Sequence, residues 1–234
     1  ENSAALETPS RRQPEATFQP SRQEGPYQVP YNGLFTFTRV RYNSGGGGGF
    51  GFRGGGSAWN HDYPSADRNI EIILAEFTYA RANTDGSNIL DLEDPRIFQY
   101  PILYMAEPGF WRATEEGTEN LRNYLLKGGM LILDDFEGNQ WNNMADQVEL
   151  ALPEYQWFEI DQSHPIFTSF FHMLDIYVPH PYVNVTPSYQ AIFEDNDPRK
   201  AILVLANHNS DIAEYWEWST NGIFGLDPTN DAYR

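Results

Sequence analysis

The chain has 234 residues, of which 40% are hydrophobic and 15% aromatic, so it has enough apolar material for one packed domain. Thirty-three acidic residues oppose fifteen basic ones, and the formal net charge is −18 at pH 7. Such a charge repels phosphate backbones, and we expect no nucleic-acid partner. Cysteine is absent, which excludes disulfides, thiolate metal ligands and cysteine nucleophiles.

Residues 1–33 form a proline-rich segment with five prolines and few apolar side chains. We expect an extended tail that becomes ordered against a protein partner, with packing on the domain's own surface as the alternative. Arg11 and Arg12 are its candidate partner-binding residues. No apolar run approaches the roughly 18 residues that a membrane-spanning helix needs, so we predict no transmembrane segment in this chain.

The folded domain is predicted to occupy residues 34–234 and to open with a strand. Residues 34–42 alternate in the two-residue period of a strand. A glycine-rich loop follows at residues 44–57, and Ser65 is predicted to cap a helix. The apolar positions of this helix recur every three or four residues and are Ala66, Ile70, Ile73, Leu74 and Phe77.

Two buried strands are predicted next, at residues 102–106 and 130–133, with a helix between them. Thr114 should cap this helix, and Gly128 should end it in the left-handed conformation. A third amphipathic helix is indicated by Trp141, Met144, Ala145, Val148 and Leu152, and further strands by residues 155–160, 189–193 and 201–206. This alternation of strands and helices predicts an α/β fold of three layers, in which helices cover both faces of a mainly parallel sheet.

Several segments, in their order and spacing, resemble the bacterial family DUF4159. They are Phe-Thr-Phe-Thr-Arg-Val-Arg-Tyr at 35–42, Tyr-Pro-Ile-Leu-Tyr at 100–104, Gly-Gly-Met-Leu-Ile-Leu-Asp-Asp-Phe at 128–136, His-Pro-Ile-Phe at 164–167 and Asn-His-Asn-Ser-Asp at 207–211. The resemblance implies a flavodoxin-like core similar to class I glutamine amidotransferases, and a periplasmic or otherwise extracytoplasmic protein. It implies no established activity. Because the nucleophilic cysteine of that fold is missing, glutaminase chemistry is excluded.

The acidic end of the strand at 130–133 is the first candidate ligand site. Asp134 and Asp135 stand where parallel sheets open into a ligand-binding crevice, and where the amidotransferase-like fold carries its nucleophile. Carboxylates there could bind Mg²⁺ or Ca²⁺ or act as a general base. Because consecutive strand residues point to opposite faces, we expect at most one of the pair to face the crevice and the other to cap the following helix.

Two further loops could reach the same crevice. One carries His61 and Asp62, and the other carries Asn207, His208 and Asp211. Two histidines and a carboxylate would suit zinc or iron, although the spacing matches no metal motif and such loop residues also serve as turns and caps. A shared ion would require ligand atoms from at least three residues within about 5 Å of a common point, in the set Asp134, Asp135, His61, His208 and Asp211.

The glycine-rich loop lacks the Lys-Ser or Lys-Thr ending of a nucleotide-binding loop, and a separate segment parts it from the helix. We therefore interpret Phe50, Phe52 and Arg53 as anchors for a protein partner.

Two functions are compatible with these residues. The first is a non-catalytic structural subunit, docked through its tail and glycine-rich loop on the extracytoplasmic face of a bacterial membrane protein complex. For it we predict no catalytic residues and no cofactor. The alternative is a metal-dependent hydrolase, or a carbohydrate-binding or small-ligand-binding protein, that uses the crevice at Asp134 and Asp135.

Overall fold

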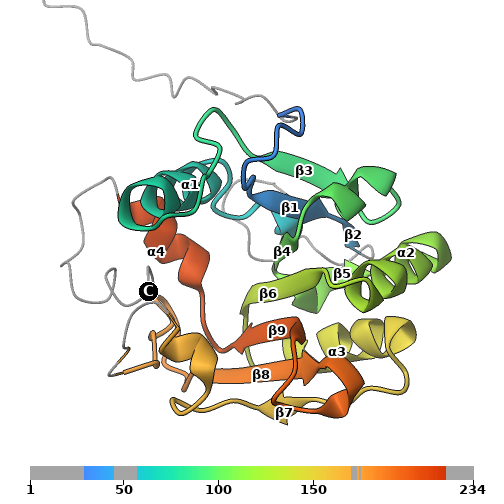
Figure 1. Ribbon diagram of the computed structural model, residues 1–234. Coiled ribbons are helices and arrows are strands. Elements are labelled where there is room, and N and C mark those ends of the chain that lie inside the picture. The colour runs from blue at the N-terminus through green and yellow to red at the C-terminus, as the bar shows by residue number, and fades with distance from the viewer. Residues whose placement is uncertain (1–28, 45–56, 170–172, 174, 220–234) are drawn as a thin grey trace, which may run out of the picture.

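The computed structural model of the protein describes residues 29–44, 57–169, 173 and 175–219. Within these residues a seven-stranded sheet has the order β3-β1-β4-β6-β9-β8-β7, and a small second sheet pairs β2 with β5 (Figure 1). The strands of the large sheet are β1 Thr38–Arg41, β3 Asn88–Asp91, β4 Ile102–Ala106, β6 Met130–Phe136, β7 Phe158–Glu159, β8 Ser188–Phe193 and β9 Ile202–His208. The strands of the small sheet are β2 Asn43–Ser44 and β5 Trp111–Arg112.

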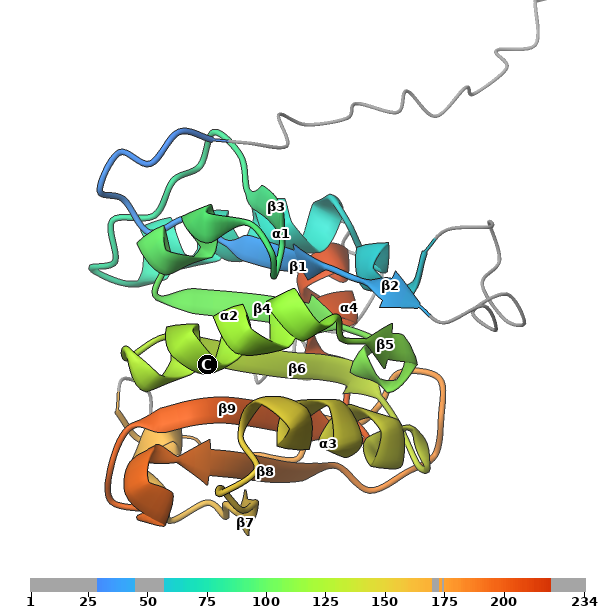
Figure 2. The same ribbon diagram turned by 90° about the vertical axis from the view of Figure 1, so that its right-hand side faces the viewer.

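Helices cover both faces of the large sheet. Helices α1 and α4 lie on one face, and α2 and α3 lie on the other (Figures 1 and 2). Their bounds are α1 Ser65–Phe77, α2 Glu115–Leu126, α3 Gln140–Ala151 and α4 Ile212–Trp218. Short 3₁₀ helices occupy Ala58–Asn60, Pro95–Gln99, Pro108–Phe110, Pro165–Phe167 and Glu194–Asn196. No helix in the described part of the chain is both long and apolar enough to span a bilayer.

Five strands of the large sheet run parallel, namely β3, β1, β4, β6 and β9. Strands β8 and β7 extend the sheet in antiparallel fashion at one edge. The predicted α/β fold with a mainly parallel sheet is therefore confirmed. The strand expected at residues 155–160 is shorter than predicted, because only Phe158 and Glu159 pair with β8.

Local sequence signals account for most of these elements. The Thr114 hydroxyl accepts a hydrogen bond from Gly117 N at 3.0 Å and so caps α2, and Gly128 has a φ of 96° just after that helix, both as predicted. Ser65 does not cap α1, since Ala66 N already donates to the carbonyl of Asp62 and Ser65 lies inside the first turn.

The apolar core lies on both faces of the sheet. One cluster packs beneath α2 and α3, and another packs beneath α1 and α4. The second cluster ends near Ile73 and Leu74, so Phe77 in the last turn of α1 is 63% exposed instead of buried as predicted. Strand β3 and helix α4 were not predicted from the sequence, and both shape the candidate site.

The proposed partner-binding residues lie outside the described part of the chain. These are Arg11 and Arg12 in the tail, and Phe50, Phe52 and Arg53 in the glycine-rich loop.

Candidate functional site

A cluster of acidic residues and one histidine lies at the carboxyl end of β6, between the starts of α1 and α4. His61 and Asp62 precede α1, Asp135 belongs to the tip of β6, and Asp211 is the N-cap residue of α4. Each of these four residues offers one ligand atom, and the four atoms lie within 4.8 Å of one another. His61, Asp135 and Asp211 belong to the set chosen from the sequence. The criterion that at least three of that set offer ligand atoms close to a common point is therefore met.

His61 is held by Asp135. Its Nδ1 lies 2.5 Å from Asp135 Oδ2 and 3.6 Å from Asp62 Oδ1. The hydrogen bond to Asp135 raises the pKa of His61 to about 10, against the opposing effect of burial. The imidazole side chain is 34% exposed, whereas the carboxylates of Asp135 and Asp62 are almost completely buried. The site is therefore open to solvent on the side of the histidine.

Several carboxylate oxygens around this site have no partner. Asp62 Oδ2, Glu107 Oε2 and Asp211 Oδ2 are buried and accept no hydrogen bond from the described residues. Asp62 is 8% exposed and Asp211 is 0% exposed. Buried polar groups in proteins nearly always have partners, so the unsatisfied oxygens make this cluster a candidate ligand site.

Burial and repulsion between neighbouring carboxylates raise the pKa values of these carboxyl groups. Burial, together with a hydrogen bond to Glu214 and the charge of Asp135, raises the pKa of Asp62 to about 10. Burial and the charge of Asp135 raise the pKa of Glu107 to about 9, and the same two causes raise that of Asp211 well above its usual range. A bound cation would offset both causes, because it supplies the opposite charge that this pocket lacks.

Three residues around the site have left-handed backbone conformations. The φ angles are 60° for Asp62, 50° for Glu107 and 61° for Asp135. Such angles are uncommon outside glycine, and they cost energy that the surrounding structure must supply. They turn the chain sharply at the carboxyl edge of the sheet, where function is expected in folds of this kind.

Asp134 has a structural role. Its carboxylate accepts hydrogen bonds from Tyr104 Oη at 3.0 Å and Asn207 Nδ2 at 3.2 Å, and from the backbone N of Ile212 and Ala213 at 3.0 and 3.1 Å. As predicted, one aspartate of the pair caps a helix, but it caps α4 and not the following helix α3. It reaches α4 because that helix starts beside the tip of β6. The N-cap residue of α3 is Asn139, whose side chain accepts no capping hydrogen bond.

His208 lies apart from the cluster. Its Nε2 is 3.1 Å from the carbonyl of Gly138, and its ring lies 5.3 Å from the rings of both Phe136 and Trp141. Burial lowers the pKa of this imidazole. Of the loop residues proposed as ligands, only His61 and Asp211 therefore join Asp135, while Asn207 supports Asp134 and His208 packs against aromatic rings.

Sequence reasoning missed Glu107, Glu214 and Glu217, whereas Asp62 was noted beside His61 but not chosen as a ligand. Asp62, Glu214 and Glu217 form a second group whose oxygens lie within 4.8 Å of one another. A signal for the two glutamates exists, because Asp211, Glu214 and Glu217 are three residues apart and such spacing places side chains on one face of a helix. Glu107 directly follows the buried strand β4, and this position is the signal that could have found it.

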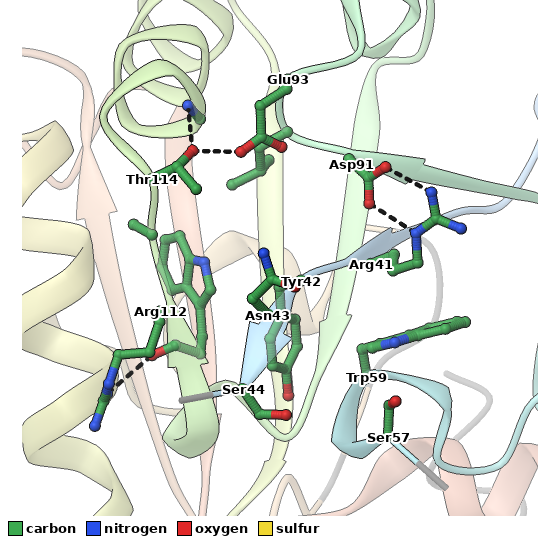
Figure 3. Close-up of a pocket in the computed structure, with 14 residues that line it drawn as sticks. Arg41, Tyr42, Asn43, Ser44, Ser57, Trp59, Asp91, Glu93, Arg112 and Thr114 are labelled. Carbon is green, nitrogen blue, oxygen red and sulfur yellow. Dashed lines mark hydrogen bonds and ion pairs between the residues drawn. The ribbon is translucent and has the colours of Figure 1, made fainter. Parts of the chain in front are cut away.

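A cavity of about 630 Å³ lies at the carboxyl ends of β1 and β3 (Figure 3). Some of its polar groups are paired with each other: Arg41 forms two hydrogen bonds with Asp91, and the Thr114 hydroxyl donates to Glu93 (Figure 3). Tyr42 lines the cavity and donates its hydroxyl proton to the carbonyl of Glu107 at 2.6 Å. Tyr42 therefore connects the wall of the cavity to the backbone of Glu107.

Comparison with known proteins gives a match to a protein family. No curated protein matches the chain. The model of a protein family described as "Domain of unknown function (DUF4159)" matches residues 36–234, which is nearly the whole folded domain. The resemblance seen in the sequence motifs is thus confirmed at the level of the family, and the chain belongs to the DUF4159 family.

Proposed function

We propose that the protein is a metal-dependent hydrolase that holds a divalent ion with His61, Asp62, Asp135 and Asp211. The observation that supports this most strongly is the convergence of four ligand atoms within 4.8 Å, with Asp62 Oδ2 and Asp211 Oδ2 buried and unpartnered. Without a cation, these carboxylates would have to stay protonated or bear a large desolvation cost.

The ligand set indicates the kind of ion. One imidazole nitrogen and three carboxylates suit Mn²⁺, Fe²⁺ or Zn²⁺, whereas an all-oxygen set would favour Mg²⁺ or Ca²⁺. The exposed side of His61 leaves room for water at the ion. A divalent ion supplies hydrolysis with a water molecule of lowered pKa and with an electrophile for the substrate oxygen.

Glu107 is a candidate for proton transfer. It follows β4 directly, its Oε2 has no hydrogen-bond partner in the described chain, and the charge of Asp135 acts on it. A carboxyl that keeps its proton near neutral pH is suited to donate it to a leaving group. The adjacent cavity, with its arginines and acids, would accommodate the remainder of a small polar substrate.

The finer fold assignment is part of this proposal. Numbered along the chain, the five parallel strands have the order 2-1-3-4-5, which is that of flavodoxin-like folds. Asp135, in its left-handed conformation after the central strand, stands near the position at which amidotransferase-like folds carry their cysteine. We propose that a metal ligand replaces the thiol there.

The experiment is a metal titration. Chelator-treated protein is titrated with Mn²⁺ in a calorimeter, alongside Asp135→Asn and the matched control Asp146→Asn, whose aspartate is exposed on α3. We expect the wild type and the control to bind alike and Asp135→Asn to bind at least tenfold more weakly. At an Mn²⁺ concentration of 100 times Kd, the ion should stabilise the fold by about 2.7 kcal/mol.

Hydrolysis is tested on the same samples. With Mn²⁺ present, we expect turnover of p-nitrophenyl phosphate or p-nitrophenyl acetate by the wild type, and its loss in Asp135→Asn. Failure of the wild type to bind Mn²⁺, Zn²⁺ or Fe²⁺ would contradict the metal site. Binding without turnover of either ester would contradict the hydrolase and leave a metal-binding protein.

The non-catalytic subunit expected from the sequence stays a prediction. It depends on residues 1–33 and on the glycine-rich loop, most of which lie outside the described residues. An extracytoplasmic location likewise remains a proposal that follows from the family resemblance. A pull-down with full-length and tail-deleted protein tests this function, and it gains weight if no metal binds.

A further inference from the structure

The acidic cluster continues beyond the four proposed ligands into α4. Asp62, Glu214 and Glu217 form the second group of carboxylates, and Asp62 belongs to both groups. We propose that the site holds two divalent ions that share the Asp62 carboxylate as a bridge. This inference rests on the proposed metal site and adds a second ion to it.

Asp62 has the features that a bridging ligand needs. Its side chain is 2% exposed, Oδ1 lies 3.6 Å from His61 Nδ1, and Oδ2 has no partner among the described residues. Asp62 also shares a hydrogen bond with Glu214. A second ion at Glu214 and Glu217 would take the place of the proton in that bond, so that each oxygen of Asp62 could bind one ion. A carboxylate between two ions is a usual element of two-metal centres, whose ions lie about 3.5–4 Å apart.

Helix α4 presents the remaining ligands from a fixed position. Asp211, Glu214 and Glu217 follow one another at intervals of three residues. The end of the helix is held to α1, because Asn69 Nδ2 donates to the carbonyls of Trp216 and Glu217 at 2.8 and 3.2 Å. Glu214 and Glu217 are therefore placed by packing between two helices, and Asp62 joins them from the turn that precedes α1.

Charge also favours two ions over one. The two groups together contain five carboxylates, from Asp62, Asp135, Asp211, Glu214 and Glu217. In the described part of the chain, no arginine or lysine forms an ion pair with any of the five. When all five are ionised, one divalent ion leaves three negative charges in a largely buried site, whereas two ions leave one. Each uncompensated charge is costly at such depth.

The test uses Mn²⁺, because two manganese ions that share a carboxylate give an exchange-coupled electron paramagnetic resonance spectrum, distinct from that of isolated ions. Chelator-treated wild type, Glu217→Gln and the control Glu149→Gln are titrated with Mn²⁺ by calorimetry. Glu149 is exposed on α3, on the other face of the sheet. Circular dichroism verifies that each variant is folded.

We expect two Mn²⁺ ions per chain and a coupled spectrum in the wild type and in Glu149→Gln. In Glu217→Gln we expect one ion and an uncoupled spectrum. One ion without coupling in the wild type would overturn the two-ion site and leave the proposed single-metal function standing, whereas no ion would overturn both. Two coupled ions in Glu217→Gln would overturn the assignment of Glu217. The spectrum of the wild type decides the question even if the variant fails to fold.

Discussion

Two buried charged regions lie next to each other beneath α1, and they are built in opposite ways. In the first, Arg39 Nε donates to Asp67 Oδ1 at 3.0 Å, Nη1 donates to the carbonyl of Trp59, and Ser87 adds a bond to Asp67 Oδ2. The Arg39 side chain is fully buried and also lies over the ring of Tyr104. Arg39 and Asp67 each have an opposite charge beside them, and Asp67 also accepts a hydrogen bond from the Ser87 hydroxyl.

The second region is the carboxylate cluster around His61, where acidic groups outnumber the single imidazole. The Oδ2 atoms of Asp62 and Asp211 have no hydrogen-bond partner in the described chain, although both residues are buried like the ion pair nearby. The same fold thus satisfies one buried charge completely and leaves the other incomplete. We interpret the difference as one between a group that stabilises the fold and a group that belongs to the proposed ligand site.

The largest expected effect concerns the first region, in which Arg39 and Asp67 are paired. Arg39→Ala should lower the free energy of unfolding by about 3–5 kcal/mol, because it leaves Asp67 as a buried and unpaired carboxylate. Urea denaturation of the metal-free protein measures this. The matched control Arg41→Ala removes the exposed pair with Asp91 and should cost about 0–1 kcal/mol. Equal losses in the two variants would contradict the assigned difference between the pairs.

A second prediction concerns Asp62→Asn, whose effect on the free energy of unfolding should reverse in sign when metal is present. In metal-free protein, Asp62→Asn should raise the free energy of unfolding by roughly 1–3 kcal/mol, because the buried carboxyl stays neutral only by keeping its proton at the cost of stability, whereas an amide is neutral without one. With Mn²⁺ present, the same substitution should lower stability relative to the wild type, because a ligand is lost. Urea denaturation with chelator and with Mn²⁺ tests both signs. Destabilisation under both conditions would indicate an ordinary structural role.

The pH dependence of the metal-free protein follows from the same residue. Because the pKa of Asp62 is raised to about 10 in the folded state, the folded protein binds more protons than the unfolded chain between about pH 4 and pH 10. Stability should therefore fall as pH rises through this window. The raised pKa of His61, about 10, acts in the same direction from about pH 6.5 upward. Asp62→Asn should flatten the profile, and Asp146→Asn should leave it unchanged.

The smallest expected effect concerns His208. His208→Gln should leave the affinity for Mn²⁺ unchanged within about twofold, and should cost about 1 kcal/mol of stability through its lost bond to Gly138. Calorimetric titration beside Asp135→Asn provides the comparison. If His208→Gln weakened Mn²⁺ binding as much as Asp135→Asn, His208 would be a ligand, and its assignment to the aromatic packing outside the site would be wrong.

Much of the fold could be predicted from local patterns. Strand β4, helix α2 with its Thr114 cap, and the turn at Gly128 follow from apolar runs and from signals that act over a few residues. Strand β3 escaped prediction because Ile89 and Leu90 are its only apolar residues, and the strand exists through pairing with β1. Its stability comes from tertiary context.

The site was predictable only in part. Alternation along a strand indicated that Asp134 and Asp135 would separate, but not which one would face the crevice. The left-handed backbone at Asp135 and the start of α4 beside Asp134 decide this, and both depend on the assembled sheet. Asp62 and Glu217 are brought together by the packing of α1 against α4, which residue spacing in the sequence does not report.

Asp134 illustrates how the molecule separates framework from chemistry. It joins β4, β9 and α4 through four hydrogen bonds, and its immediate neighbours are Asp135 on β6 and, across the gap, Asp211 at the start of α4. The anchor therefore sets where the proposed ligands stand without being one of them. If the proposed site binds an ion, an engineer could exchange the surrounding acids to change the ion preference, provided that this one aspartate is left untouched.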